Sequence, residues 1–173
     1  MSGSALFGAP WDQKLTMLTI LFSTLMLGST GLVVWLALTR VPVAPIRLLM
    51  ILGAVVPVAA FVIAAMMGPR GYAIADGRLR IDRLVRPIEI PLSSIRSVER
   101  LPPDRLAGSL RTLGSGGLFG YYGTFRNEEL GEYRMYATRS DGYVLVRADR
   151  PYVLTPESPD VFVETLDWER TAR

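Results

Sequence analysis

The sequence contains no cysteine and no histidine, and its one lysine is Lys14. Without cysteine the chain can form no disulfide, thiol nucleophile or thiolate metal site. Without histidine it lacks the commonest general base and metal ligand. Catalysis would have to rely on carboxylates, hydroxyls and arginines alone. We therefore expect that the protein is not an enzyme and that it holds no metal ion or cofactor.

Two long stretches contain no charged residue, residues 15–39 and residues 48–69. The composition agrees with a membrane protein, because 50% of the chain is hydrophobic and only 20% is charged. As a helix, each stretch would exceed the roughly 30 Å hydrocarbon core of a bilayer. They predict two transmembrane helices. A cleavable signal peptide explains the first stretch less well, because the stretch is long and a second one follows almost at once.

Small residues in these stretches would let the two helices approach each other closely. They are Gly28, Gly31, Gly53, Ala60 and Ala64.

The basic residues beside the two stretches predict the orientation in the membrane. Two spans place both termini on one side. The short loop between the spans carries Arg40 and Arg47. The other side carries Lys14 and five arginines that follow the second span: Arg70, Arg78, Arg80, Arg83 and Arg86. Because positive charge is enriched in cytoplasmic segments, both termini are predicted in the cytoplasm of a multi-pass cell-membrane protein.

The rest of the chain, residues 71–173, has the common size of one domain. It holds fifteen arginines and fifteen acidic residues, so its net charge is zero. With no basic tail and no DNA- or RNA-binding motif, we expect no nucleic-acid partner. The predicted organisation is a tail over residues 1–14, a helical hairpin over residues 15–70, and this domain.

The periodicity of the domain is that of short β-strands. Asp76-Gly77 is a two-residue turn between alternating segments, which predicts a β-hairpin. Leu79 and Ile81 would then face a core, whereas Arg78 and Arg80 would face solvent. Further short segments, separated by turn residues, predict a small barrel of about seven strands.

The end of the chain changes from strand to helix periodicity. A capping serine followed by proline predicts a helix over about residues 159–168. Phe162 and Leu166 lie four residues apart and give this helix one apolar face, with Trp168 near it. The helix is expected to close one end of the barrel.

The order of these motifs resembles the bacterial pleckstrin-homology-like (PH-like) domain family, in which a two-helix membrane anchor often precedes the domain. The resemblance runs through the strand hairpin, IPLSSIRSVE, GLFGYYGTF, EYRMYATR, YVLV and YVLTPESPDVFVETL. Its most specific parts are residues 117–125 and residues 156–166. It implies a PH-like barrel capped by a C-terminal helix. It implies no reaction, because this fold hosts many binding roles.

The glycine-rich stretch GSGGLFGYYGTF, residues 114–125, invites comparison with phosphate-binding loops. It has no lysine followed by serine or threonine, and it leads into a strand and not a helix, so it is not predicted to bind nucleotide. Two interpretations remain. The large side chains form a tip at the membrane interface, or they pack inside the barrel while the glycines allow bends at its corners. The residues concerned are Leu118, Phe119, Tyr121 and Tyr122.

A second candidate site consists of four arginines near the first hairpin: Arg78, Arg80, Arg83 and Arg86. Eukaryotic PH domains that bind phosphoinositides use basic residues around an early hairpin, so the resemblance implies a lipid-headgroup site here. The same alternation is typical of any exposed strand face.

These features predict an integral membrane protein that presents a cytoplasmic PH-like binding or scaffolding domain. Its partners would be the lipid bilayer, anionic lipid headgroups, or an unidentified membrane or cytoplasmic protein. The alternative is an accessory subunit of a larger membrane transporter or envelope complex, in which the domain is purely structural.

Overall fold

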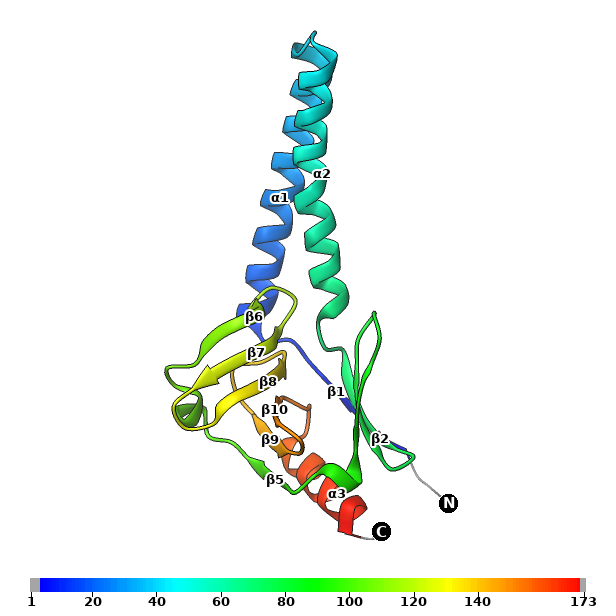
Figure 1. Cartoon of the computed structure of the whole chain (residues 1–173), viewed down its shortest axis with the longest axis vertical. Coiled ribbons are helices and arrows are strands. Elements are labelled where there is room, and N and C mark those ends of the chain that lie inside the picture. Colours follow the sequence, from blue (N-terminus) through cyan, green and yellow to red (C-terminus); the bar gives the residue numbers. More distant parts are fainter. Residues whose placement is uncertain (1–3, 172–173) are drawn as a thin grey trace.

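The computed structural model describes residues 4–171; residues 1–3 and 172–173, at the outer ends of the predicted tail and domain, lie outside it. Two long helices project from a mainly β domain (Figure 1). They are α1 (Gln13–Arg40) and α2 (Ala44–Met67). A third helix, α3 (Pro159–Thr171), lies at the opposite end of the domain, next to the C-terminus.

Both long helices are long and apolar enough to cross a membrane. With 28 and 24 residues they extend roughly 42 and 36 Å at 1.5 Å per residue. Only 6% of the apolar stretch of either helix is buried inside the molecule. A core helix of a soluble protein would bury its apolar side chains, so these helices are not part of a soluble core.

The predicted role of the small residues in helix packing is wrong for the glycines. A Cβ atom added at Gly28, Gly31 or Gly53 would meet no atom within 4 Å. These glycines therefore face away from the neighbouring helix. The buried residues of the two helices are Leu15, Thr19 and Ala37 in α1 and Ala54 in α2.

The first sheet contains four antiparallel strands in the order β1-β2-β3-β4. They are β1 (Ala5–Gly8), β2 (Gly71–Ala75), β3 (Arg78–Asp82) and β4 (Ile88–Pro91). Strand β1 precedes α1 in the chain and pairs with β2, which follows α2. The predicted tail therefore supplies an edge strand of the domain. Four residues are too few to carry a clear period-two pattern, which is why the sequence does not reveal this strand.

The hairpin between β2 and β3 forms as predicted. Asp76 and Gly77 have φ angles of 51° and 73°, as a two-residue turn between twisted strands requires. Leu79 and Ile81 are fully buried, whereas Arg78 is exposed.

The second sheet has six strands in the order β5-β9-β10-β8-β7-β6. Strand β10 runs parallel to β8, and the other neighbours are antiparallel. The strands are β5 (Ser97–Arg100), β6 (Leu110–Gly116), β7 (Tyr121–Asn127), β8 (Gly131–Ala137), β9 (Val144–Arg147) and β10 (Pro151–Leu154). Short 3-10 helices, η1 (Leu92–Ser94) and η2 (Pro103–Leu106), flank β5. Residues 4–171 thus contain ten strands, more than the predicted seven, because several strands have only four residues.

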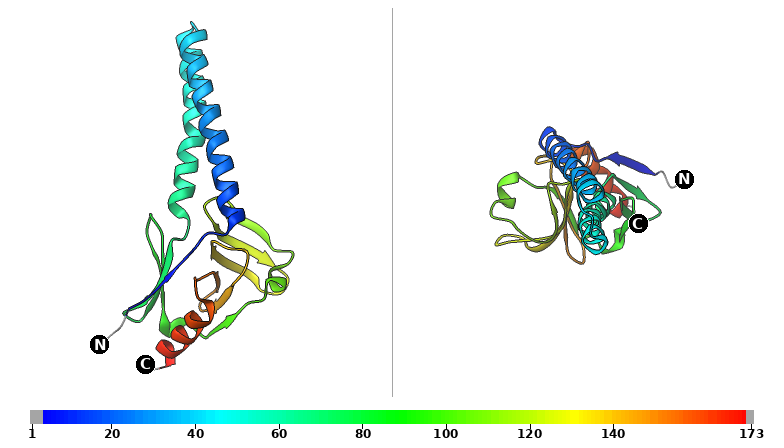
Figure 2. Two further views of the ribbon diagram at one scale, coloured as in Figure 1. Left: turned by 180° about the vertical axis from the view of Figure 1, so that it is seen from behind. Right: turned by 90° about the horizontal axis from the view of Figure 1, so that it is seen from above.

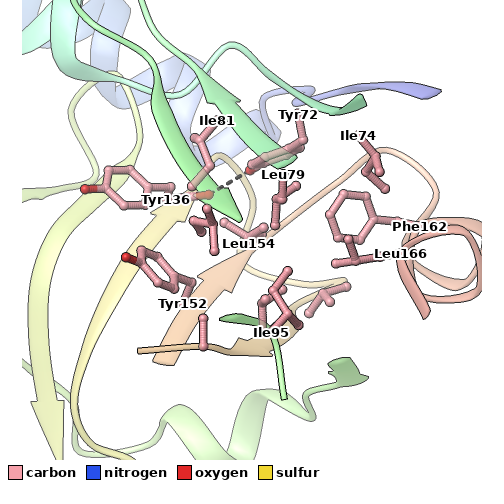
Figure 3. Packing of buried hydrophobic residues seen from close by; sticks show 14 of the residues in the cluster. Tyr72, Ile74, Leu79, Ile81, Ile95, Tyr136, Tyr152, Leu154, Phe162 and Leu166 are labelled. Carbon is pink, nitrogen blue, oxygen red and sulfur yellow. Dashed lines mark hydrogen bonds between the residues drawn. The ribbon is translucent and has the colours of Figure 1, made fainter. Parts of the chain in front are cut away.

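The main core lies between the two sheets and is closed by α3 (Figure 3). At its centre the Tyr72 hydroxyl donates a hydrogen bond to the Tyr136 carbonyl at 2.7 Å and accepts one from the Thr155 N–H at 3.2 Å. This side chain therefore joins β2 to β8 and to the end of β10. Burial of the phenol raises the pKa of Tyr72 to about 12.

The second sheet also buries side chains on its other face. This smaller cluster includes Phe125, Tyr133, Met135, Leu145 and Val153. Burial on both faces explains why β9 and β10 read as continuous apolar segments.

Helix α3 begins at Pro159, as the sequence predicts, and buries Phe162 and Leu166 completely. The Phe162 ring meets the Phe7 ring edge-on with a centroid distance of 5.0 Å. Trp168 was expected near this apolar face but is 73% exposed. At 100° per residue it lies about 200° around the helix from Leu166, on the opposite side.

Candidate functional site

Several segments of the domain contact the ends of α1 and α2 that lie next to it. The two helices lie together near their connecting loop and diverge toward the domain (Figures 1 and 2). The connection between β6 and β7, residues 117–120, lies beside the diverging ends. Residues 117–120 are called the glycine loop below.

The backbones of β6 and β7 approach each other so closely that two positions in this stretch require glycine. Gly114 and Gly123 lie opposite each other in β6 and β7. A Cβ atom on Gly114 would lie 2.0 Å from the Tyr122 carbonyl oxygen, and one on Gly123 would lie 2.1 Å from that of Leu113. Both glycines also have φ angles of 110° or more, which side chains disfavour. The stretch therefore forms a hairpin of two strands, in agreement with the prediction that it is not a nucleotide loop.

Phe119, in the glycine loop, connects the domain to both helices. Its ring contacts the ring of Phe61 in α2 with a centroid distance of 4.7 Å, and that of Trp11, just before α1, at 6.3 Å. Its N–H donates to Thr19 Oγ1 in α1 at 3.4 Å. Its φ angle of 57° is left-handed, which costs roughly 1–2 kcal/mol for a residue with a side chain. The aromatic contacts offset this strain.

The domain also satisfies backbone groups at the end of α2. The last four carbonyls of a helix have no partner within the helix. The Tyr122 hydroxyl donates to the Ala64 carbonyl at 2.7 Å, and the Val85 N–H donates to the Met66 carbonyl at 3.3 Å. Two different hairpins thus cap α2, one through the Tyr122 side chain and the other through the Val85 backbone.

The other large residues of the glycine-rich stretch point in different directions. Leu118 lines a hollow together with Leu18 and Phe22 of α1. Tyr121 packs against the smaller core cluster, and Tyr122 belongs to the main core. The four predicted residues are therefore shared between the helix contact and the interior: packing inside the domain describes Tyr121 and Tyr122, and the interpretation as a tip at the membrane interface stays a prediction.

Asp12 fixes the start of α1 to the domain, a contact that the sequence analysis missed. Its Oδ1 accepts from the Leu15 N–H at 2.7 Å and caps the helix. Its Oδ2 accepts from the Ser140 N–H at 3.0 Å and from the Ser140 hydroxyl at 2.9 Å. Burial by itself raises the pKa of Asp12, but these hydrogen bonds to the carboxylate lower it below its usual value. The sequence signal was an aspartate directly before an apolar helix.

The four predicted arginines do not form one group. Arg78 pairs with Glu89, and Arg80 Nε lies 2.7 Å from Asp82 Oδ1. Strand register places Arg78 opposite Ala75, at the end of β2 that points away from α2. It lies about 13 Å further along the strand than Asp82, at roughly 3.3 Å per residue. A single site for all four arginines is therefore wrong.

Arg83 and Arg86 lie in the connection between β3 and β4, beside the end of α2. Residues 83–86 of this connection are called the β3–β4 tip below. The Arg83 Nη2 donates to the Arg86 carbonyl at 2.6 Å and holds the turn. Between the two arginines, Leu84 and Val85 are 54% and 48% exposed. Within residues 4–171, no carboxylate lies within 4.0 Å of either guanidinium.

Eight of the sixteen acidic side chains lie in surface ion pairs. Arg105, for example, pairs with Glu129 and lies 3.6 Å from Glu99. In residues 4–171, no three His, Cys, Asp or Glu side chains are grouped so that they could hold a metal ion.

Comparison with known proteins identifies the family of the domain. The family model described as "Bacterial PH domain" matches residues 70–169. No match was found among the curated proteins or among the solved structures. The matched segment covers every strand except β1, and α3 up to residue 169. With more than half of its residues in this match, the chain belongs to the bacterial PH domain family.

Proposed function

We propose that this protein is an integral membrane protein that holds its PH domain against the cytoplasmic leaflet and binds anionic lipid there. The two apolar helices span the bilayer, and the β3–β4 tip and the glycine loop lie at its surface. The domain then acts as a membrane-surface binding module for lipid headgroups. A protein partner would be recruited to the same surface.

The observation that carries this proposal is the composition and position of the β3–β4 tip. Two exposed apolar side chains, Leu84 and Val85, stand between two arginines that have no acidic partner within 4.0 Å among the described residues 4–171. The tip is joined to the last turn of α2 through the bond from Val85 to Met66. Apolar side chains flanked by arginines suit the boundary between hydrocarbon and anionic headgroups.

The rigid attachment of the domain supports the proposal further. Strand β1 pairs with β2 along four residue pairs, from Ala5–Ile74 to Gly8–Gly71, so the domain contains chain from both sides of the helical hairpin. The Asp12 carboxylate and the Phe119 ring add two more attachments. A domain held at this many points keeps one face toward the bilayer.

A label on the tip tests the lipid contact. Because the chain has no cysteine, Leu84→Cys provides one site for an environment-sensitive fluorophore such as NBD. In full-length protein in phosphatidylcholine nanodiscs containing phosphatidylglycerol, we expect stronger, blue-shifted emission than in pure phosphatidylcholine. The matched label at Trp168→Cys, on the exposed side of α3, should emit as in water in both.

The arginines should account for the dependence on lipid charge. Arg83→Gln and Arg86→Gln, each made in the Leu84→Cys chain, should reduce the response to phosphatidylglycerol by about fivefold, since each basic residue near an anionic surface contributes about 1 kcal/mol. Water-like emission from position 84 in both bilayers would rule out contact of the tip with lipid.

The orientation has its own test. In intact cells, a membrane-impermeant maleimide should fail to label Trp168→Cys and should label it after the membrane is opened. Labelling of intact cells would place the domain outside the cytoplasm.

The accessory-subunit role is a second candidate, favoured by the outward glycines. Gly28 and Gly31 lie three residues apart on the open side of α1, where another helix could approach closely. In this case one membrane protein should co-purify in mild detergent and be lost with Gly28→Leu but not with Leu32→Ile. Purification without a stoichiometric partner would exclude this role.

A further inference from the structure

We infer that the protein binds a single anionic phospholipid in a pocket between the end of α2 and the segment that leads into α1. The pocket has a volume of about 350 Å³. The inference rests on the proposed function in one respect, because a bilayer must surround the helices for the lipid to enter. It goes beyond the proposed function because it assigns a defined site and stoichiometry and not only a preference for a charged surface.

The walls of the pocket come from four separate segments. Trp11 and Ala9 belong to the connection from β1 to α1, and Ala65 to the last turns of α2. Phe119 comes from the glycine loop and Leu84 from the β3–β4 tip. The connection from α2 to β2 completes the lining with Gly68, Pro69 and Arg70. The pocket therefore exists only when the domain is docked on the helix ends.

Arg70 is the only charged residue in this lining. Its backbone is fixed, because its N–H donates to the Asp82 carbonyl at 2.9 Å. Its side chain is exposed, and within residues 4–171 no carboxylate lies within 4.0 Å of it. A guanidinium without a carboxylate partner can bind phosphate oxygens through two parallel N–H donors. Because the lining contains one arginine and no carboxylate, the pocket favours an anionic ligand over a cationic one.

The remaining lining is apolar and continuous with the helix surfaces that would face lipid. Trp11 and Leu84 are both partly exposed at the pocket, and Trp side chains prefer the headgroup level of a bilayer. Small-molecule pockets measure about 300–1,000 Å³, so this volume suits a phosphate and glycerol group and not a whole lipid. The acyl chains would therefore continue along the exposed apolar side chains at the end of α2. A phospholipid meets both requirements at once, whereas a soluble anion would leave the apolar wall uncovered.

Trp11 provides a direct probe of this site. The chain has three tryptophans, so Trp35→Phe with Trp168→Phe leaves Trp11 as the only one. The full-length double variant in mild detergent is titrated with brominated phosphatidylglycerol, whose bromines quench nearby indole fluorescence. We expect saturable quenching with one lipid per chain, and at least 10-fold weaker binding of brominated phosphatidylcholine.

Two variants of the pocket test the assignment in different ways. Arg70→Gln removes the charge and should weaken phosphatidylglycerol binding by about 10-fold, the lower range for a hydrogen bond to a charged group. Ala65→Phe fills the pocket and should abolish saturable quenching. The matched control is Val62→Phe, a similar enlargement at an exposed position of α2, which should leave binding unchanged.

Several results would overturn the inference. They are non-saturable quenching, equal affinity for the two lipids, and unchanged binding in both Arg70→Gln and Ala65→Phe. Displacement of the lipid by millimolar inorganic phosphate would assign the pocket to a free anion instead. Arg86 and Val85 are both outside the lining, so they separate the two proposals: Arg86→Gln should weaken the response of a label at Val85→Cys to the bilayer and leave Trp11 quenching intact. If the tip label responds to lipid while Trp11 quenching is not saturable, only the pocket is wrong; the reverse would contradict the surface contact alone.

Discussion

The hydroxyl of Tyr122 in β7 donates a hydrogen bond to the backbone carbonyl of Ala64 in α2 at 2.7 Å. Tyr122 itself is buried in the main core of the domain. One side chain therefore belongs to the interior of the β domain and to the end of an apolar helix. This relationship makes the helix end depend on the folded domain, and it leads to tests that separate docking from folding.

Tyr122→Phe should weaken the docking of the domain on α2 by about 1 kcal/mol, because one buried hydrogen bond is lost while the ring remains. The expected result is faster amide hydrogen exchange in the last two turns of α2. Tyr133→Phe is the matched control, because the Tyr133 hydroxyl bonds Ser109 Oγ at 2.7 Å, away from the helices. If both variants change exchange in α2 equally, the bond from Tyr122 has no specific role in docking.

Phe119 should show two opposing effects, loss of ring contacts and relief of backbone strain. Phe119→Ala removes the contacts with Phe61 and Trp11 but keeps a side chain at a φ of 57°, so we expect a loss of about 2 kcal/mol. Phe119→Gly loses the same contacts without the strain and should be about 1 kcal/mol more stable than Phe119→Ala. Thermal unfolding in detergent measures both. A glycine variant less stable than the alanine variant would contradict the account of strain.

Gly68 should tolerate no side chain, unlike the glycines within the helices. A Cβ atom at Gly68 would lie 2.4 Å from the Phe119 carbonyl oxygen. Because this oxygen belongs to the backbone, a rotation of a side chain cannot relieve the clash. We expect Gly68→Ala to displace the glycine loop and to lower the melting temperature. Gly53→Ala, which meets no atom within 4 Å, is the control and should leave it unchanged or slightly raised. Equal melting temperatures for the two variants would show that the loop is not held against Gly68.

Asp12 should make the attachment of α1 sensitive to acid. Its pKa in the folded protein is lowered from the ordinary value of 3.8, so folding favours the charged form. The resulting stability is present above pH 3.8 and is lost as the pH falls through the lowered pKa. Melting temperatures between pH 6 and pH 2.5 should therefore fall less steeply for Asp12→Asn than for the unaltered chain. Identical slopes would mean that the bonds to Leu15 and Ser140 do not depend on the charge of Asp12.

The parts of the fold with local sequence patterns were predictable. The alternation around Leu79 and Ile81 gave the correct hairpin and its buried face, and the proline after a serine gave the start of α3. These elements depend on neighbours within a few residues, which is the range over which periodicity and capping act.

The site depends on pairings between segments far apart in the chain, which the sequence does not encode locally. Strand β1 and β2 are separated by both long helices, and Asp12 meets Ser140 across 128 residues. The arginines of the predicted site lie apart for the same reason, because strand register places Arg78 and Arg86 at opposite ends of one hairpin. The aromatic residue of the glycine loop, Phe119, is visible in the sequence, but nothing in a uniformly apolar helix marks Phe61 as its partner.

The central claim is that the domain is docked on the helix ends through the glycine loop. Cross-linking of Phe61→Cys with Phe119→Cys by a short bis-maleimide in native membranes tests it most directly, because the chain has no other cysteine and the two rings are in contact. The control pairs Phe61→Cys with Trp168→Cys, on the far side of the domain. The account predicts an intramolecular cross-link in most chains of the first pair and in almost none of the second. Equal cross-linking of the two pairs, or none in either, would contradict it.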